Sequence, residues 1–308
     1  MNLKKPKFWN YHKPSIYSYL FLPITYLIKL INLYKKIKQP KKFKIKTICV
    51  GNIYVGGTGK TSLSIKLNKI LSKNNVKSCF IKKFYKDQID EQKLLKSNGK
   101  LFVSISRADA IKQAEKQEYD VAILDDGLQD KSIKYDLVFV CFNNINWVGN
   151  GMTIPSGPLR ENIKNLVHYK NIFLNGNLEN SDNLINEILK INPKAIIHLG
   201  KYVPINLDEF DKKEKYLVFS GIGNHQTFIA MLKNYGFNIL KDIEFSDHYN
   251  YTNKDISEIL VEAKKLNCKI ITTEKDYFRI ENMNLDEIKF IKSDLEIIEE
   301  DKLVRSLI

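Results

Sequence analysis

Short apolar runs alternate with helical stretches along the chain from about residue 45 onward. The runs are continuous rather than alternating, which is typical of strands buried on both faces of a parallel sheet. They predict strands at 47–50, 79–82, 101–105, 121–124, 137–142, 172–174 and 195–199. Helices are predicted between them at 60–73, 107–116 and 183–191. Since parallel strands need crossover connections, this order indicates an α/β domain with helices on both faces of its sheet.

A charged stretch at 208–215 resembles a connector, and a second series of elements follows it. Strands are predicted at 216–220, 238–245, 269–273 and 289–291, and helices at 225–235 and 254–266. We therefore expect three parts: an N-terminal segment at 1–44, a main α/β domain at 45–207 and a smaller α/β domain at 208–308.

The N-terminal part differs from the rest, because residues 16–34 are almost continuously apolar and have Lys on both sides. A secretory signal peptide would need a cleavage site of small residues after the apolar run, whereas Lys and Pro follow here. A transmembrane helix would be long enough, at about 28 Å from the rise of 1.5 Å per residue. A helix that packs on the core or on a partner is a third interpretation.

We favour a helix that lies in the membrane interface. Its polar residues are spaced 7, 4, 3 and 4 apart, which places them on one narrow stripe: Ser18, Thr25, Lys29, Asn32 and Lys36. The remaining surface is Ile, Leu, Tyr and Phe, and Pro23 is expected to kink the helix. Seven Lys follow between residues 35 and 46. This pattern predicts attachment to an anionic membrane surface, either peripheral or through an N-terminal anchor.

The net charge of +14 also favours an anionic partner. Nearly all of the basic excess is Lys, and Arg occurs only at 107, 160, 279 and 305. We expect no nucleic-acid partner, because the chain has no Arg-rich patch, zinc-finger spacing or aromatic RNA-binding motif. Its four Cys are scattered without a Cys-x-x-Cys pair, which favours buried thiols over a metal or redox site.

A glycine-rich stretch follows the first predicted strand and opens the first predicted helix. It reads Gly-Asn-Ile-Tyr-Val-Gly-Gly-Thr-Gly-Lys-Thr-Ser from Gly51 to Ser62. Glycines let backbone N–H groups surround phosphate oxygens, and the helix N-terminus adds a positive field. Lys60 is expected to reach the outer phosphates of a nucleotide, and the Thr61 hydroxyl to coordinate Mg²⁺. The predicted nucleotide-binding residues are Gly56, Gly57, Thr58, Gly59, Lys60, Thr61 and Ser62. Tyr54 stands where the usual pattern has Gly.

Two further stretches carry candidate chemistry. Four apolar residues precede Asp125 and Asp126, so a buried strand delivers two carboxylates to the carboxyl edge of the sheet, where α/β proteins bind ligands. Either carboxylate is suited to hold Mg²⁺, directly or through water. The second stretch, from Gly149 to Glu161, is rich in Gly and Pro and ends in Arg160-Glu161. Taken alone, it is also compatible with an ordinary turn at the start of a helix.

Together these motifs resemble the tetraacyldisaccharide 4'-kinase family. The resemblance rests on Gly-Asn-x-x-x-Gly-Gly-Thr-Gly-Lys-Thr, then Asp-Asp-Gly-Leu-Gln, then Gly-Asn-Gly followed by Pro-x-Gly-Pro-Leu-Arg-Glu. It continues through Phe219–Asn224, Phe245–Thr252 and Thr272–Asp276, and so covers about residues 46–280. The resemblance implies a P-loop kinase that uses ATP and Mg²⁺ to phosphorylate the 4'-hydroxyl of a tetraacyldisaccharide 1-phosphate, giving lipid IVA. It also implies the cytoplasmic face of the bacterial inner membrane.

The resemblance assigns roles to individual residues of this chain. Lys60 and Arg160 would act on phosphate groups as catalytic residues. The metal environment would consist of Thr61, Asp125, Asp126 and Glu161. Gln129 and Asn150, which belong to the second and third motifs, would contact the acylated glucosamine disaccharide.

The same resemblance implies that His248 pairs with an acidic residue that activates the sugar hydroxyl. Asp90 is the best match for that acid, since Asp90-Glu91-Gln92 stands for the family's Asp-Glu-Pro. The chain departs from the family here, because Lys82-Lys83-Phe84-Tyr85 replaces Ser-Arg-Gly-Tyr and the following segment is short. Asp87 therefore competes with Asp90 for the role of base.

Two other functions are compatible with a phosphate loop. A membrane-associated ATPase switch of the partitioning or targeting type shares the Gly-Gly-x-Gly-Lys-Thr sequence. Such proteins usually have a second Lys before the glycine pair, where this chain has Val55. A GTPase would need an Asn-Lys-x-Asp guanine motif, which the sequence lacks.

Overall fold

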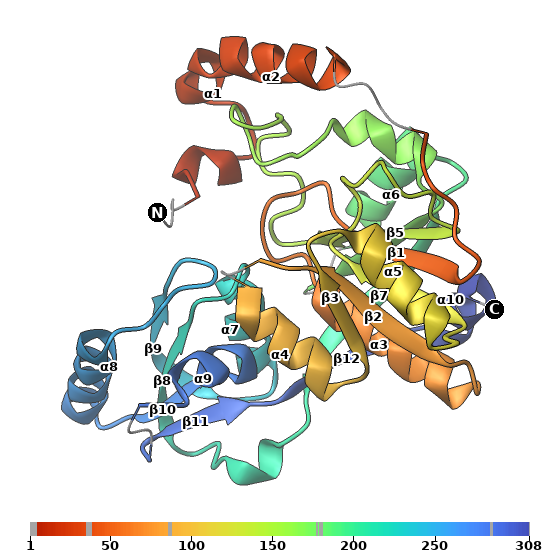
Figure 1. Cartoon of the computed structure of the whole chain (residues 1–308). Coiled ribbons are helices and arrows are strands. Elements are labelled where there is room, and N and C mark those ends of the chain that lie inside the picture. The colour runs from red at the N-terminus through yellow and green to blue at the C-terminus, as the bar shows by residue number, and fades with distance from the viewer. Residues whose placement is uncertain are drawn as a thin grey trace.

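The computed structural model describes residues 5–34, 39–85, 88–176, 178, 181–283 and 286–307, and these residues form two sheets (Figure 1). The larger sheet has eight strands in the order β12-β7-β6-β5-β1-β4-β2-β3. The smaller sheet has four strands in the order β11-β10-β8-β9, all parallel. The predicted α/β class, with mostly parallel sheets, is confirmed.

Helices form crossover connections between parallel strands of the larger sheet. Its elements are β1 (Lys46–Gly51), α3 (Lys60–Lys73), β2 (Ser78–Lys83), α4 (Ile89–Ser97), β3 (Leu101–Ser104), α5 (Arg107–Lys116), β4 (Val121–Asp125), β5 (Leu137–Asn143), β6 (Asn171–Asn175), α6 (Asp182–Ile191) and β7 (Ile196–Pro204). The strand β1 pairs with β4 and β5, and Val50 lies opposite Asp125. The carboxyl ends of β1 and β4 therefore meet at one edge of the sheet.

Alternate residues of the central strands pack on opposite faces of the larger sheet, in three clusters. Ile48 and Val50 of β1 pack with α3 in one cluster, whereas Cys49 belongs to a cluster on the opposite face that includes α6. Cys79 packs with α5 in a third cluster. Three of the four cysteines are buried in these clusters, Cys49, Cys79 and Cys141, which confirms the prediction of buried thiols for them.

The smaller sheet is also covered on both faces. Its elements are β8 (Lys215–Ser220), α7 (His225–Asn234), β9 (Asn238–Glu244), α8 (Asn253–Leu266), β10 (Lys269–Thr273), α9 (Glu274–Ile280) and β11 (Ile288–Ile291). Helix α7 packs on one face through Phe228 and Leu232. Helices α8 and α9 pack on the other, through Ile256 and Ile280.

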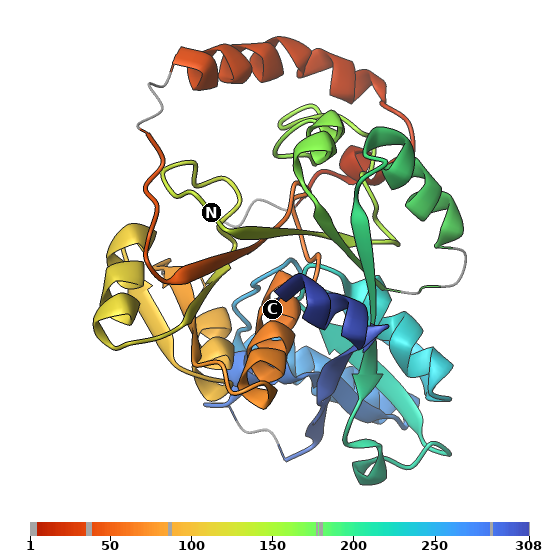
Figure 2. The same cartoon turned by 90° about the vertical axis from the view of Figure 1, so that its right-hand side faces the viewer.

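The C-terminal residues return to the larger sheet, and the predicted extent of the second domain to residue 308 is wrong in this respect. Strand β12 (Ser293–Ile298) pairs antiparallel with β7, with Ser293 opposite Pro204. Helix α10 (Glu300–Leu307) then lies beside α3, and its leucines join the same core (Figure 2). The physical reason is apolar burial: Leu295 and Leu303 are almost completely buried there.

The N-terminal helices lie on the loop between β5 and β6. After a short 3₁₀ turn, η1 (Lys7–Asn10), helix α1 (Ile16–Leu20) ends at Phe21, and α2 (Leu22–Tyr34) follows at an angle (Figure 1). The side chains of Ser18 and Thr25 are buried. The predicted polar stripe therefore points into the protein at these two positions; its last member, Lys36, lies outside the described residues.

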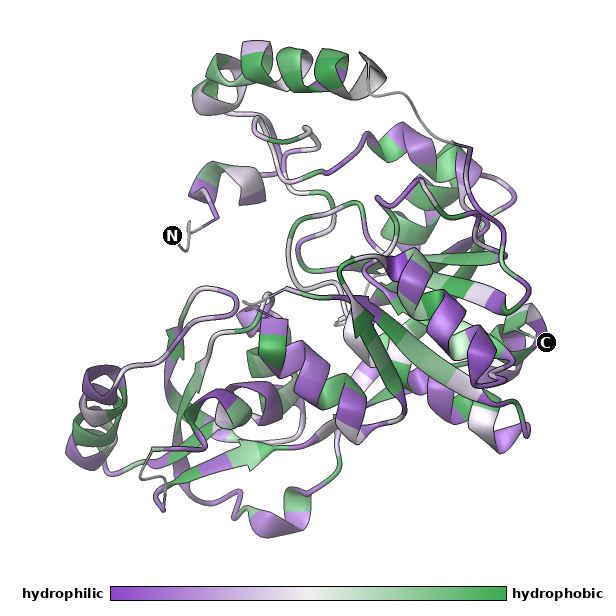
Figure 3. Cartoon of the chain, viewed as in Figure 1, coloured by the Kyte–Doolittle hydropathy of each residue, from purple (hydrophilic) through white to green (hydrophobic). Residues whose placement is uncertain are grey.

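The outer surface of these helices is apolar, as Figure 3 shows. Ile16 is 80% exposed and Leu20 is 72% exposed. Further exposed side chains are Tyr17, Tyr19, Ile24, Tyr26, Leu27, Leu30 and Ile31. Across the described part of the chain, no helix combines the length and hydropathy that a membrane span requires.

Candidate active site

The phosphate loop joins β1, at the centre of the larger sheet, to α3. Gly59 precedes α3 with a φ of 77°, in the left-handed region that favours glycine. A Cβ atom at Gly59 would lie 2.7 Å from the Asn175 amide nitrogen. That same amide donates a hydrogen bond of 2.7 Å to the Thr58 carbonyl. Gly57 lies against Gly223 of the second domain, so closely that a Cβ atom would come within 2.8 Å of the Gly223 carbonyl carbon.

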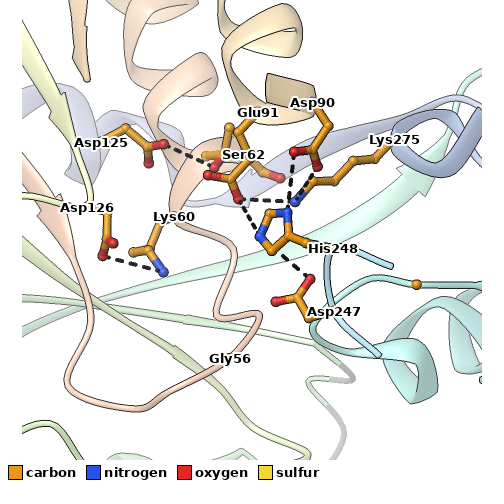
Figure 4. A network of polar contacts seen from close by, with 12 residues as sticks. Gly56, Lys60, Ser62, Asp90, Glu91, Asp125, Asp126, Asp247, His248 and Lys275 are labelled. Carbon is orange, nitrogen blue, oxygen red and sulfur yellow. Dashed lines mark hydrogen bonds and ion pairs between the residues drawn. The ribbon is translucent and has the colours of Figure 1, made fainter. Parts of the chain in front are cut away.

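The carboxylates at the end of β4 lie beside this loop. Asp125 is fully buried, and its Oδ2 accepts a hydrogen bond of 3.2 Å from the Thr61 hydroxyl. Asp126 has a φ of 59°, an uncommon backbone conformation for a residue other than glycine. Arg107 donates to the Asp126 carbonyl at 2.6 Å and so satisfies the backbone there. The Asp126 carboxylate faces Lys60, with 3.7 Å between Nζ and Oδ1 (Figure 4).

The third motif closes the other side of Asp126. Arg160 Nη1 lies 3.0 Å from Asp126 Oδ1 and donates to Gln129 Oε1 at 2.9 Å. The Gln129 amide donates in turn to the Asn52 carbonyl in the phosphate loop, at 2.9 Å. Burial would raise the pKa of Asp126, but the charges of Lys60 and Arg160 outweigh burial and hold this pKa below its usual value. The three sequence motifs thus form one charged group.

A carboxylate–imidazole pair forms between the two domains. Asp90 lies in the first turn of α4, and His248 lies in the loop after β9. His248 Nδ1 and Asp90 Oδ1 are 3.3 Å apart (Figure 4). His248 has a φ of 56°, and its backbone N–H donates to the Gly221 carbonyl at 3.1 Å. This left-handed conformation points to a constrained loop at the pair.

Two cations of α9 surround the pair. Arg279 Nη2 lies 2.6 Å from Asp90 Oδ2, and Lys275 Nζ lies 3.4 Å from the same oxygen. Burial would raise the pKa of Asp90, but the hydrogen bond with His248 and the charges of Lys275 and Arg279 outweigh burial. The pKa of Asp90 is therefore held well below its usual range. Asp90 is an ionised carboxylate in this arrangement.

Comparisons with known proteins identify the family of this chain. A family model described as Tetraacyldisaccharide-1-P 4'-kinase matches residues 16–308. A tetraacyldisaccharide 4'-kinase of Pelagibacter ubique is 58% identical over 311 aligned residues, which cover 100% of this chain and 98% of the relative. Another from Rickettsia canadensis is 33% identical, covering 92% and 90%. The chain belongs to the tetraacyldisaccharide-1-phosphate 4'-kinase family.

A solved structure shows the same fold. The crystal structure of the "apo" form of LpxK from Aquifex aeolicus, in complex with ATP, superposes with a TM-score of 0.67 at 23% identity. The match covers 94% of this chain and 98% of that one. The family resemblance predicted from the motifs is thus confirmed, and the alternative of an ATPase switch is not favoured.

Two of the predicted site residues, Asn150 and Glu161, form hydrogen bonds within the protein. Asn150 is buried, and its amide donates to the Ser18 hydroxyl at 2.9 Å and to the Ser156 carbonyl at 3.0 Å. These contacts hold the N-terminal helices on their loop. Glu161 accepts a hydrogen bond of 2.8 Å from Asn165, and the Tyr169 hydroxyl is 3.2 Å away. The expected role of Glu161 as a metal ligand stays a prediction, and Asp87 lies outside the described residues.

Four charged residues of this kinase-family site received no role from the sequence: Lys82, Glu91, Lys275 and Arg279. Lys82 is buried on β2 and pairs with Asp125 and Glu91. Burial lowers the pKa of Lys82, but its two carboxylate partners outweigh burial and hold this pKa above its usual range. A lysine near the end of an apolar strand was the available signal, and Arg279 is one of only four Arg.

The residues beside the phosphate loop fit a magnesium ion. Among the described residues, no three His, Cys, Asp or Glu side chains gather into a metal-binding group. However, the Thr61 hydroxyl and the Asp125 carboxylate adjoin at 3.2 Å. Magnesium typically takes one or two protein oxygens and completes its shell with substrate phosphates and water. The Thr61–Asp125 pair therefore supplies the small number of protein ligands that magnesium usually takes.

Proposed function

We propose that this protein is an ATP-dependent kinase that phosphorylates the 4'-hydroxyl of a tetraacyldisaccharide 1-phosphate to give lipid IVA. The observation that carries the proposal is the Asp90–His248 pair, which lies across from the phosphate loop and is contributed by both domains. A nucleotide switch needs the loop and its metal ligands, whereas a kinase also needs a group that deprotonates an acceptor. Family membership supports the same acceptor.

The donor side is the charged group at the end of β1 and β4. The glycine-rich backbone and Lys60 would bind the phosphates of ATP, and the ATP bound to the Aquifex aeolicus structure supports this choice of nucleotide. Thr61 and Asp125 would hold Mg²⁺, which when bound neutralises phosphate charge. Arg160, now paired with Asp126 at 3.0 Å, would exchange part of that contact for phosphate oxygens. Gln129 fixes the Arg160 guanidinium and so serves orientation.

The acceptor side is the pair between the domains. A sugar hydroxyl is a poor nucleophile until its proton is being removed. Asp90 is ionised and would accept that proton, while His248 orients the carboxylate from its Nδ1 side. Arg279 and Lys275 also contact Asp90. Because these cations weaken the carboxylate as a base, proton removal would accompany phosphoryl transfer and not precede it. Catalysis would then come mainly from positioning and charge neutralisation.

The membrane side is the outer face of α1 and α2. Its exposed Ile, Leu and Tyr side chains would enter the headgroup region, while the buried Ser18 and Thr25 hold the helices on the protein. We place the enzyme on the cytoplasmic face of the bacterial inner membrane, attached peripherally. Removal of residues 1–34 should lower its sedimentation with anionic vesicles. Unchanged sedimentation of the truncated protein would locate the attachment elsewhere.

The decisive test is the fate of the phosphate. Purified protein, ATP, Mg²⁺ and an acylated glucosamine disaccharide 1-phosphate should give a lipid with one added phosphate by mass spectrometry. A lipid lacking the 4'-hydroxyl is the matched control and should gain none. If ATP is hydrolysed while no lipid gains phosphate, the proposal is overturned in favour of an ATPase.

A further inference from the structure

The β2 strand buries a lysine ammonium group in the middle of the site. The side chain of Lys82 is 1% exposed. Its Nζ lies 2.6 Å from Asp125 Oδ2 and 2.7 Å from Glu91 Oε2. An ammonium group in such a place is stable only when carboxylates compensate its charge. The neighbouring Lys83 does not share this environment, since its Nζ lies over the Tyr85 ring at 5.6 Å from the centroid.

The two partners of Lys82 belong to different halves of the site. The oxygen of Asp125 that contacts Lys82 also accepts the hydrogen bond from Thr61 of the phosphate loop, at 3.2 Å. Glu91 follows Asp90 in the first turn of α4. Its Oε1 lies 3.0 Å from Lys275 Nζ and 3.6 Å from His248 Nε2. One buried ammonium group thus stands between the nucleotide side and the acceptor side.

We propose that Lys82 is a positioning residue that couples these two sides, by holding Asp125 and Glu91 together. The inference deepens the proposed kinase function and rests on it for the acceptor side. Lys82 has two effects. It fixes the first turn of α4, and therefore Asp90, relative to the phosphate loop. It also shares Asp125 Oδ2 with whatever cation the Thr61–Asp125 pair binds, and so sets how strongly that pair attracts a cation.

These effects predict that loss of Lys82 raises the affinity for Mg²⁺ while it lowers kcat. Without the ammonium charge, Asp125 attracts Mg²⁺ more strongly, so half-saturation needs less metal. Without the bridge to Glu91, Asp90 is less well placed, so kcat falls. A lysine that only stabilised the fold would lower the fraction of active protein and leave the metal requirement unchanged.

The first experiment needs no lipid. Lys82→Met and the control Lys83→Met remove the same charge from adjacent residues of β2. Binding of a fluorescent ATP analogue is titrated with Mg²⁺ in the wild type and in both variants. Lys82→Met should lower the half-saturating Mg²⁺ concentration by about tenfold. Two unit charges about 4 Å apart interact appreciably even at the dielectric constant of water, so removal of the ammonium charge relieves its repulsion of the metal ion. Lys83→Met should leave it unchanged. An unchanged Mg²⁺ requirement in folded Lys82→Met overturns the proposal, whatever the acceptor is.

The second experiment separates positioning from folding. Lys82→Met removes the cation that pairs with Asp125 and leaves Glu91 with Lys275 alone, so this variant will be less stable. The double variant Lys82→Met/Glu91→Gln removes one charge of each sign. Its melting temperature should therefore recover part of the way toward that of Glu91→Gln alone, in which Lys82 still pairs with Asp125. Its kcat on the glycolipid should stay at least about tenfold below wild type, because a 1 Å misplacement can cost still more. Recovery of kcat together with stability would show that Lys82 only supports the fold. A wild type that phosphorylates no glycolipid would refute the kinase proposal, while the Mg²⁺ titration still decides the contact with Asp125.

Discussion

The replacement of Arg279 by Met should destabilise the protein far more than the loss of one surface charge. The Arg279 side chain is 8% exposed and makes three short contacts. Its guanidinium lies 2.6 Å from Asp90 Oδ2, 2.6 Å from Asp276 Oδ1 and 2.7 Å from the Gly221 carbonyl oxygen. Met fills much of the volume of the Arg279 side chain, but it removes the positive charge that compensates the buried carboxylates of Asp90 and Asp276. Breaking such a buried pair costs about 3–5 kcal/mol. For a chain of this size, that lowers the melting temperature by roughly 5–15 °C.

The effect has a defined pH dependence. The folded pKa of Asp90 lies below its usual range, so the ionised form is stabilised by folding. Its contribution to stability is present above the unfolded pKa, about 3.9, and is lost as pH falls through the folded pKa. The difference in melting temperature between wild type and Arg279→Met should therefore be full at pH 7. It should shrink as pH falls below about 4.

The assay is thermal unfolding followed by circular dichroism or calorimetry across this pH range. Lys254→Met is the matched control, because Lys254 and Glu258 form an exposed ion pair at 3.9 Å on α8. Such a pair is worth about 1 kcal/mol at most. Arg279→Lys should lie between wild type and Arg279→Met, since lysine keeps the charge but not the forked geometry. The reasoning is refuted if Arg279→Met melts within the range of the control, or if the difference does not change at low pH.

Three other predictions concern activity and the N-terminal helices. Asp90→Asn and His248→Ala should each lower kcat by about 10²–10⁴-fold, and the double variant should be scarcely worse. Fully multiplicative losses in steady-state assays would show that the two residues act independently. Lys60→Ala should lower kcat by at least about 10²–10³-fold, and near-normal turnover would contradict its role at the phosphates. Thr25→Val removes the 2.8 Å hydrogen bond to the Ser156 hydroxyl. It should speed proteolysis within α1 and α2 without changing the melting of the core, and unchanged cleavage would show that this contact is unimportant.

The donor side of the site was predictable from sequence because its geometry is local. A glycine-rich loop between a strand and a helix has few conformations, and the carboxyl ends of adjacent parallel strands meet at one edge. Lys60 and Asp126 are therefore neighbours through β1 and β4 alone, with 3.7 Å between them. The pairing of Asp90 with His248 came from the family resemblance. No spacing rule relates residues that are 158 positions apart.

The remainder depends on tertiary contacts that sequence patterns do not encode. Helix α9 has only seven residues, which is too short for a helical apolar period to be recognised, so Arg279 had no predicted position. Strand β12 has alternating burial, as an edge strand does, but alternation does not specify which sheet the strand joins. Ser18 and Thr25 were predicted to lie on one polar stripe. Such a stripe can face either water or a polar loop of the protein, and the sequence pattern does not distinguish these two environments. In the structure Ser18 contacts Asn150 and Thr25 contacts Ser156, so the stripe faces the protein at these two positions.

The return of β12 has a consequence for how the site is assembled. The chain leaves the larger sheet after β7 and re-enters it at β12, and these two strands are paired from Ser293 to Ile298. The second domain is therefore connected to the first at one place, by two adjacent crossings. A single connection of this kind restrains translation of the domain more than rotation about the connection. The remaining orientation must come from contacts further away. These include the charged contacts of Asp90 and Glu91 with α9 and His248, which under the proposed function would also lie beside the acceptor. Under the proposed function, these side chains would contribute both to the orientation of the domain and to the acceptor chemistry.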